Sequence, residues 1–180
     1  MDTELKNVSW SVPHYIDTSV AVKLAVPEDE SSRLREYLRV NWSYHFHITE
    51  FAFYETLSVL KRKLEKKEIN QNTYLGAVAT LAGYMEEGQL QIDSDFRLDD
   101  FKVIYRVGEL VKTYFLDYSD ALQIYTVLNG KWSGKRFECT TVLVTADSSL
   151  AEAARGEGLR VWNPLEETIP PSWEELKREG

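Results

Sequence analysis

Short apolar runs and longer stretches with helical spacing alternate along the chain. Strands are predicted where a run is continuously apolar or strictly alternating, at residues 14–17, 44–49, 140–147 and 159–164. Helices are predicted where apolar residues recur three or four positions apart, over residues 20–26, 29–40, 50–68, 71–87, 99–115 and 116–130, with a short Ala-rich helix after Asp147. The stretch LQIDSDF, residues 90–96, is either a turn or a short strand.

The order of these elements indicates the fold class. Helices separate the strands, and most of the strands are almost continuously apolar. The pattern therefore predicts an α/β fold with a central parallel sheet and helices on both faces. Thr49 is placed to cap the helix that begins at residue 50, and Gly130 is placed to stop the helix before it. Between residues 99 and 115 one helical face carries the apolar residues Val103, Val107, Leu110, Val111 and Tyr114.

Length and composition are those of a single globular domain over residues 1–180. We expect its core within residues 14–164, and a C-terminal appendage over residues 165–180 that is either a plain surface segment or a docking element for a partner chain. No apolar stretch is long enough to span a bilayer, and Cys139 is the one cysteine. A cytoplasmic protein without an internal disulfide is expected.

The charge balance restricts how this chain could meet a nucleic acid. Acidic residues outnumber basic ones by 29 to 21, so the formal charge is −8. Contact with RNA must therefore come from local basic groups or bound cations. The basic run KRKLEKK, residues 61–67, is either a solvated, salt-bridged face or a contact for an RNA backbone.

A second local group lies in the loop GKWSGKRFE. Lys131, Lys135 and Arg136 stand there beside Trp132, which combines charge with a stacking surface of the kind that single-stranded RNA uses. A loop with a buried aromatic anchor explains the same residues nearly as well.

Four acidic residues fall near predicted strand ends and helix starts. Asp17 and Asp147 end strands, Asp120 lies in the first turn of a helix, and Glu55 lies about two turns into the helix after the second strand. In a parallel sheet these positions share one edge, so the carboxylates can converge. Converging carboxylates repel one another unless a cation lies between them, and Mg²⁺ or Mn²⁺ takes oxygen ligands. The pattern predicts a metal site for phosphodiester hydrolysis.

Several of these acids have a competing structural role. Asp17 could cap the helix that follows it, and Glu50 suits the first turn of its helix without any further function, so Glu55 is preferred as the ligand. Asp117 and Asp120 lie on one helical face. We expect Asp117 to cap the helix, which leaves Asp120 as the ligand.

Two further acidic patterns need no active site. Ser149 and Glu152 have the spacing of a capping box close to Asp147. Asp93 and Asp95 are expected to lie in a solvated turn.

The segments that carry the four acids resemble the successive blocks of a PIN domain. YIDTSV, ITEFAFYETLSVL, LDYSDAL and LVTADSSLAEAARGEGLRVWNP come in the family's order and span residues 15–164. The resemblance implies a PIN-like three-layer fold and a ribonuclease that depends on Mg²⁺ or Mn²⁺. It also implies that Asp17 and Asp120 hold the principal metal, with Glu55 and Asp147 completing the site.

The same resemblance extends to supporting residues and partners. Thr145, Ser119 and Thr18 match polar positions that orient water or metal ligands. Many PIN proteins are the toxins of VapBC-type toxin–antitoxin pairs, so the implied partners are an RNA substrate, a cognate antitoxin and a second copy of the chain. This chain is longer than a minimal PIN toxin near residues 90–96, in the loop after Gly130 and in the tail.

Three functions remain open at this stage. The first is a metal-dependent ribonuclease that acts as a toxin. The second is a non-catalytic PIN-fold module that binds RNA or protein. The third is a phosphohydrolase with Asp17 as a covalent nucleophile, but such enzymes need a second acid two residues later, where this chain has Ser19.

Overall fold

A computed structural model describes residues 13–26, 31, 32, 34, 35, 45–94, 100–133 and 141–166. The elements in chain order are β1 (Pro13–Ile16), α1 (Thr18–Ala25), β2 (His45–Thr49), α3 (Glu50–Glu65), α4 (Gln71–Glu86), β3 (Leu90–Asp93), α5 (Phe101–Tyr114), α6 (Tyr118–Asn129), β4 (Val142–Val144), α7 (Ser148–Gly156) and β5 (Arg160–Trp162). Among these described segments, no helix is long and apolar enough to cross a membrane.

Some predictions fall outside the described residues. They concern most of the helix at 29–40, Asp95, Lys135 with Arg136, and the tail after residue 166.

The strands form one parallel sheet in the order β3-β2-β1-β4-β5. β1 lies at its centre, where Tyr15 pairs with His47 of β2 on one side and with Leu143 of β4 on the other. The predicted α/β fold with a parallel central sheet is therefore confirmed. Of the two alternatives for residues 90–96, the structure shows a strand, β3, over Leu90–Asp93, and it pairs with β2 as an outer strand of the sheet.

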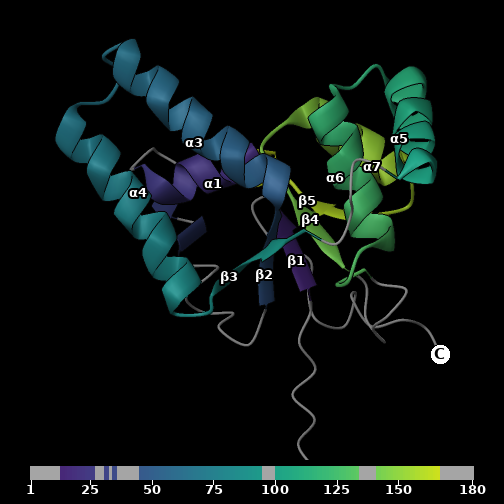
Figure 1. The fold of residues 1–180 in the computed structure, drawn as a ribbon, viewed down its shortest axis with the longest axis horizontal. Coiled ribbons are helices and arrows are strands. Elements are labelled where there is room, and N and C mark those ends of the chain that lie inside the picture. Colours follow the sequence, from purple (N-terminus) through teal and green to yellow (C-terminus); the bar gives the residue numbers. More distant parts are fainter. Residues whose placement is uncertain are drawn as a thin grey trace, which may run out of the picture.

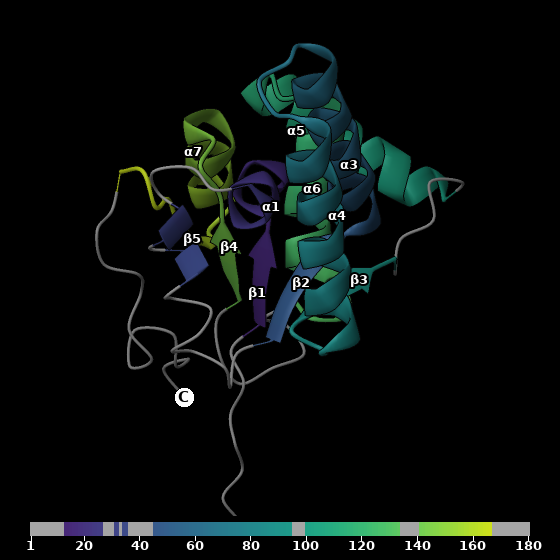
Figure 2. The same ribbon diagram turned by 90° about the vertical axis from the view of Figure 1, so that its left-hand side faces the viewer.

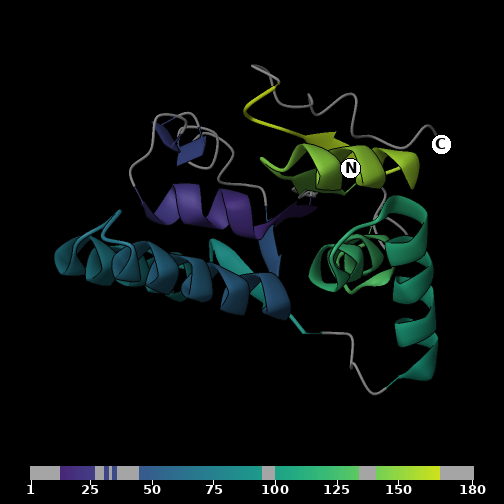
Figure 3. The same cartoon turned by 90° about the horizontal axis from the view of Figure 1, so that it is seen from above.

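Helices cover both faces of the sheet, as Figures 1 and 3 show. On one face, Ile16, Ile48, Val144 and Trp162 pack against α1 and α3. On the other face, Tyr15, Leu143 and Val161 pack against α5, α6 and α7. A third apolar cluster joins α1, α3 and α4 to one another. The alternation of side chains along each strand divides the core into these two main layers.

Helix ends follow the local signals in the sequence. The Thr49 hydroxyl accepts a hydrogen bond from the Ala52 N–H at 3.2 Å, which confirms the predicted cap of α3. On α5 the predicted apolar face is buried at Val103, Val107 and Leu110. The first strand ends one residue earlier than predicted, because Asp17 is already the N-cap of α1.

Gly130 ends α6 as predicted, but for a reason that the sequence does not show. Its φ is −70°, an ordinary value for any residue. A Cβ at this position would lie 2.6 Å from the Thr126 carbonyl oxygen and 3.1 Å from Oδ2 of Asp93. Glycine is therefore required for space and not for backbone conformation.

Asp93 does not lie in a solvated turn, and that prediction was wrong for this residue. Asp93 is 5% exposed at the end of β3, and the Tyr15 hydroxyl donates a hydrogen bond to its Oδ2 atom. The pairing of β3 with β2 moves Asp93 onto the sheet face covered by α6. A buried carboxylate requires donors of this kind, because burial without them costs several kcal/mol.

Substituting Tyr15 by Phe should lower the free energy of unfolding by about 1–3 kcal/mol, because it removes a donor from a buried carboxylate. Urea denaturation followed by circular dichroism measures the change. Tyr105→Phe is the matched control, since Tyr105 is 58% exposed on α5 and should show no loss. Equal stability of the two variants would mean that the Tyr15 hydrogen bond contributes nothing.

Candidate active site

The candidate site lies at the carboxyl edge of the sheet, between β1 and β4. The chain leaves β1 to build β2 and β3 on one side, and it returns to place β4 and β5 on the other. Such a reversal of strand order opens a crevice at the strand ends, where α/β proteins bind ligands. Figure 2 shows the arrow of β1 pointing towards α1 at this edge. The backbone N–H of Asp17 donates to the Val144 carbonyl at 3.1 Å and joins the two strand ends.

Asp17 is only 4% exposed, and its carboxylate accepts three hydrogen bonds. Its Oδ1 atom accepts from the Val20 N–H at 2.9 Å and from the Ser19 hydroxyl at 2.7 Å, and Oδ2 accepts from the Thr145 hydroxyl at 2.6 Å. Burial raises the pKa of Asp17 to about 6, the three hydrogen bonds oppose this rise, and the charge of Asp147 adds to it. Asp17 is thus both a helix cap and a fixed carboxylate at the pocket.

Thr145 and Ser19 tie Asp17 to the segment that carries Asp147. The Thr145 hydroxyl oxygen accepts from the Asp147 N–H at 2.9 Å, and the Ser19 hydroxyl oxygen accepts from the Ala146 N–H at 2.9 Å. Sequence reasoning named Thr145 but missed this role of Ser19. The available signal was its position two residues after an N-cap aspartate, inside the first helical turn.

Glu55 enters the site from α3. The Thr18 hydroxyl donates to its Oε2 atom at 2.9 Å, so the first residue of α1 positions a carboxylate of α3. Glu50, the competing acid, is exposed in the first turn of α3 and does not line the pocket. Thr18 and Glu55 both line it.

Asp120 and Asp117 both face the site from the start of α6. Burial raises the pKa of Asp120 to about 7, and the charges of Asp147, Glu55, Asp17 and Asp117 add to the rise. Asp117 occupies the N-cap position, but its side chain makes no capping hydrogen bond, contrary to our expectation. It lines the pocket as well, so the structure gathers five acidic residues there and not four.

Asp147 does not end a strand, contrary to our expectation. β4 stops at Val144, and Asp147 is exposed three residues later. Its Oδ1 atom accepts from the Leu150 N–H at 2.9 Å, so Asp147 is the N-cap of α7. The Ser149–Glu152 pattern therefore does not mark the start of this helix.

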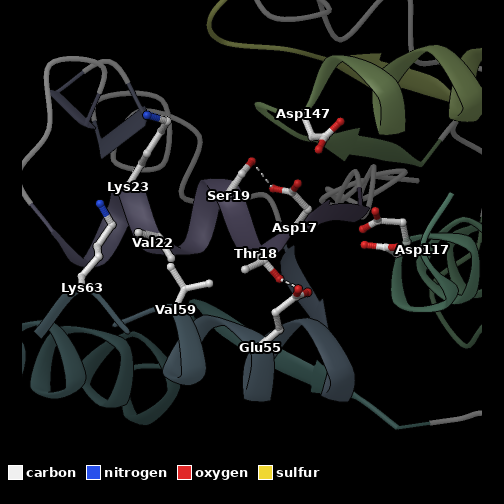
Figure 4. Close-up of a pocket in the computed structure, with 11 residues that line it drawn as sticks. Asp17, Thr18, Ser19, Val22, Lys23, Glu55, Val59, Lys63, Asp117 and Asp147 are labelled. Carbon is white, nitrogen blue, oxygen red and sulfur yellow. Dashed lines mark hydrogen bonds between the residues drawn. The ribbon is translucent and has the colours of Figure 1, made fainter. Parts of the chain in front are cut away.

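These side chains line a pocket of about 410 Å³. Figure 4 shows the labelled acids at one end and two lysines at the other. The lining residues are Asp17, Thr18, Ser19, Val22, Lys23, Glu55, Val59, Lys63, Asp117, Asp120 and Asp147. Carboxylate oxygens are the ligands that Mg²⁺ and Mn²⁺ prefer. Burial, and after it the charges of the neighbouring acids, disfavours the ionised form of Asp120 in the absence of a cation. As the side chains stand, no three metal-ligating residues in the described parts of the chain surround a common point.

The described residues of the predicted RNA-binding loop, Lys131 and Trp132, do not line this pocket. Trp132 stacks on His47, with ring centroids 4.5 Å apart, and packs against the core on the α6 side of the sheet. Its carbonyl accepts from Thr141, just before β4 begins, at the sheet edge opposite the acids. The Lys131 ammonium lies 4.8 Å above the Trp132 ring. The contacts favour the alternative of a buried aromatic anchor.

Ser119 does not line the pocket. Its supporting role stays a prediction.

A model of the PIN domain family matches residues 14–156, a span that contains all the acids of the pocket. The chain belongs to the PIN domain family. None of the curated proteins matches its sequence. This PIN domain nevertheless shares its fold with solved structures of low sequence identity.

Three solved structures illustrate the similarity. PAE2754 from Pyrobaculum aerophilum is 18% identical with a TM-score of 0.55, over 86% of this chain and 92% of that one. VapBC2 from Rickettsia felis, solved with a DNA fragment from its promoter, is 15% identical with a TM-score of 0.51, over 84% and 98%. FitAcB from Neisseria gonorrhoeae is 14% identical with a TM-score of 0.50, over 86% and 99%. They confirm the PIN-like three-layer fold.

In the metal-free PIN domain, Asp120→Asn should raise the melting temperature, because it removes a charge that burial and the neighbouring acids both disfavour. The pKa of Asp120 is higher in the folded protein than its ordinary value near 4. The folded state therefore loses stability as the pH rises from about 4 through 7, and the advantage of the variant should grow over that range. Melting curves in EDTA at pH 5 and pH 8 measure it. A gain that does not increase with pH would contradict the charge repulsion.

Melting curves with Mn²⁺ decide between Asp117 and Asp120 as ligands. A hundredfold excess of metal over its dissociation constant stabilises the wild type by about 2.7 kcal/mol, or roughly 5–10 °C here. Asp120→Asn should lose most of this gain, and Asp117→Ala should keep it. Because Asp117 makes no capping bond, its own substitution should cost little stability. The reverse pattern of metal responses would assign the ligand to Asp117.

Proposed function

We propose that this PIN domain is an endoribonuclease that depends on Mg²⁺ or Mn²⁺ and that it is the toxin of a toxin–antitoxin pair. The observation that carries the proposal is the set of carboxylates at the β1–β4 crevice, contributed by four separate parts of the chain. Asp17, Glu55, Asp120 and Asp147 all line one pocket. Membership of a family of nucleases supports the same activity.

In this proposal the residues of the pocket have two roles in phosphodiester hydrolysis, binding of the metal and orientation of its ligands. Asp17 and Asp120, with Glu55 and Asp147, would hold a divalent ion, which would supply the activation of water and the offset of charge on the phosphate. Thr145 keeps the Asp17 carboxylate in one orientation through its 2.6 Å hydrogen bond.

Thr18 orients Glu55 in a similar way, because its hydroxyl donates a hydrogen bond from α1 to this carboxylate of α3. The pocket is open to solvent next to Asp147, which is exposed, so a polymeric substrate can reach the acids.

The proposed partners follow from the same family. Two of the similar structures are named VapBC2 and FitAcB, and VapBC-type pairs consist of a toxin and an antitoxin. We therefore propose a cognate antitoxin and an RNA substrate for this chain, and a homodimer as its own assembly. A small neighbouring gene for a DNA-binding protein would support the antitoxin.

A non-catalytic module with the same fold is the alternative. The complete set of acids speaks against it, because like charges gathered in a binding module would only cost stability. A phosphohydrolase with Asp17 as nucleophile is less well supported. Both oxygens of Asp17 accept hydrogen bonds, and Ser19 stands where the second acid would be required.

Asp147→Asn should abolish Mn²⁺-dependent cleavage of an RNA panel, with a loss of about 100-fold or more, while the protein stays folded. Asparagine caps a helix as well as aspartate does, so the start of α7 should be preserved. Asp100→Asn is the matched control, because Asp100 caps α5 in the same way through the Lys102 N–H at 2.8 Å and does not line the pocket. Cleavage rates and melting curves of both variants provide the measurement.

EDTA should silence the wild type, and Asp17→Asn should be as inactive as Asp147→Asn. If either variant cleaved RNA at the rate of the wild type, the substituted acid would not be required for catalysis. Activity that survives EDTA would point to chemistry without a metal. If pure wild-type protein with Mn²⁺ cleaves no RNA but binds it, the non-catalytic module is the better description.

A further inference from the structure

We propose that Lys23 and Lys63 form a second phosphate subsite in the same pocket, which binds a phosphate of the RNA strand beyond the one that is cleaved. This inference rests on the proposed ribonuclease function, and it concerns how a substrate strand is held. Both lysines line the pocket together with the acids. Sequence reasoning attached no role to Lys23.

The two lysines come from helices that also carry acids of the site. Lys23 lies six residues after Asp17, about 9 Å along α1, and Lys63 lies eight residues after Glu55, about 12 Å along α3. Val22 and Val59 line the pocket between the two ends. In Figure 4 both ammonium groups lie at the end of the pocket away from Asp147 and Asp117. The rise along the helices between the acids and the lysines, about 9–12 Å, is comparable to the length of one or two nucleotides of a single strand.

The lysines are the positive charges of a pocket that is otherwise acidic. Lys23 and Lys63 are the two basic residues among the lining side chains, which otherwise include five acids. An RNA strand that places one phosphate near the acids must place its neighbours along the groove. A lysine pair there attracts a phosphate as point charges, and it offsets the repulsion from the acidic end. Val59, which is partly buried at the wall of the pocket, offers an apolar surface that suits a sugar or base face.

The burial of the two lysines suits a binding site better than a solvated surface. Lys23 is half-buried, and the side chain of Lys63 is 25% exposed, with its ammonium 3.6 Å from Glu68. Lys61, two residues earlier in the same basic run, is 64% exposed and pairs with Glu65 at 2.8 Å. The two alternatives for the run at 61–67 thus apply to different residues of it. Lys63 faces the pocket, and Lys61 belongs to the solvated face.

Binding of a labelled single-stranded RNA of about ten nucleotides tests the subsite, measured by fluorescence anisotropy with Ca²⁺ in place of Mn²⁺. The double variant Lys23→Met, Lys63→Met should weaken binding about 10-fold or more. It should also lower the slope of log affinity against log salt by roughly 0.7, since the contact to one phosphate of a single strand is lost. Methionine keeps the aliphatic stem of lysine, so the fold should be retained.

The matched control is Lys61→Met, Lys112→Met, which makes the same change of charge at two exposed positions outside the pocket. It should leave both affinity and salt slope close to wild type. Lys23→Arg with Lys63→Arg should retain most of the affinity, because the charge is kept. Equal weakening in the pocket and control variants would overturn the subsite and leave only a general effect of charge.

Cleavage kinetics separate this inference from the proposed function. With Mn²⁺, the pocket variant should cleave the long RNA with a raised KM and a nearly unchanged kcat. A dinucleotide that reaches only the acidic end should be cleaved as by wild type. If the wild type cleaves RNA and the pocket variant has the same affinity, salt slope and KM, the proposed subsite is wrong and the proposed ribonuclease function is retained. If nothing is cleaved but the affinity and salt slope fall as expected, the ribonuclease is wrong and the phosphate subsite stands.

Discussion

The candidate site depends on one buried hydrogen bond, from the Thr145 hydroxyl to the Asp17 carboxylate at 2.6 Å. It joins the ends of β1 and β4 at the point where the strand order of the sheet reverses. The same Thr145 oxygen accepts from the Asp147 backbone, so a single hydroxyl fixes the relation between two acids far apart in sequence. Ser19 repeats the connection through Ala146. Without these donors, a carboxylate that is 4% exposed would be expensive to keep at the crevice.

The gathering of acids in the pocket has a cost in stability. Burial raises the pKa of Asp120 to about 7, and the charges of the neighbouring acids add to this rise. Functional sites commonly break the rules that stabilise the rest of a fold. Lys23 and Lys63 at the other end show how a chain of charge −8 could still bind a polyanion, since local charge and not net charge acts over the length of a groove.

The sequence by itself determined the class of the fold and most of the described elements, β3 excepted. Strand and helix periodicity are local properties, and helices between the strands leave parallel pairing as the natural arrangement. The cap at Thr49 and the apolar face of α5 were predictable because both depend on neighbours within one or two turns. The gathering of Asp17, Glu55, Asp120 and Asp147 followed as well. In a parallel sheet, strand ends and helix starts must share an edge.

Only the tertiary structure decided what each side chain contacts across the fold. Asp93 is buried because β3 pairs with β2 and Tyr15 reaches it from β1, neither of which local spacing reveals. Asp117 stands at a helix cap without making the bond, and it turns to the pocket instead. Lys63 faces the pocket while Lys61 faces solvent, although both belong to one run of charge. Spacing along a chain sets where a residue lies on its element, whereas the packing of elements sets which groups it meets.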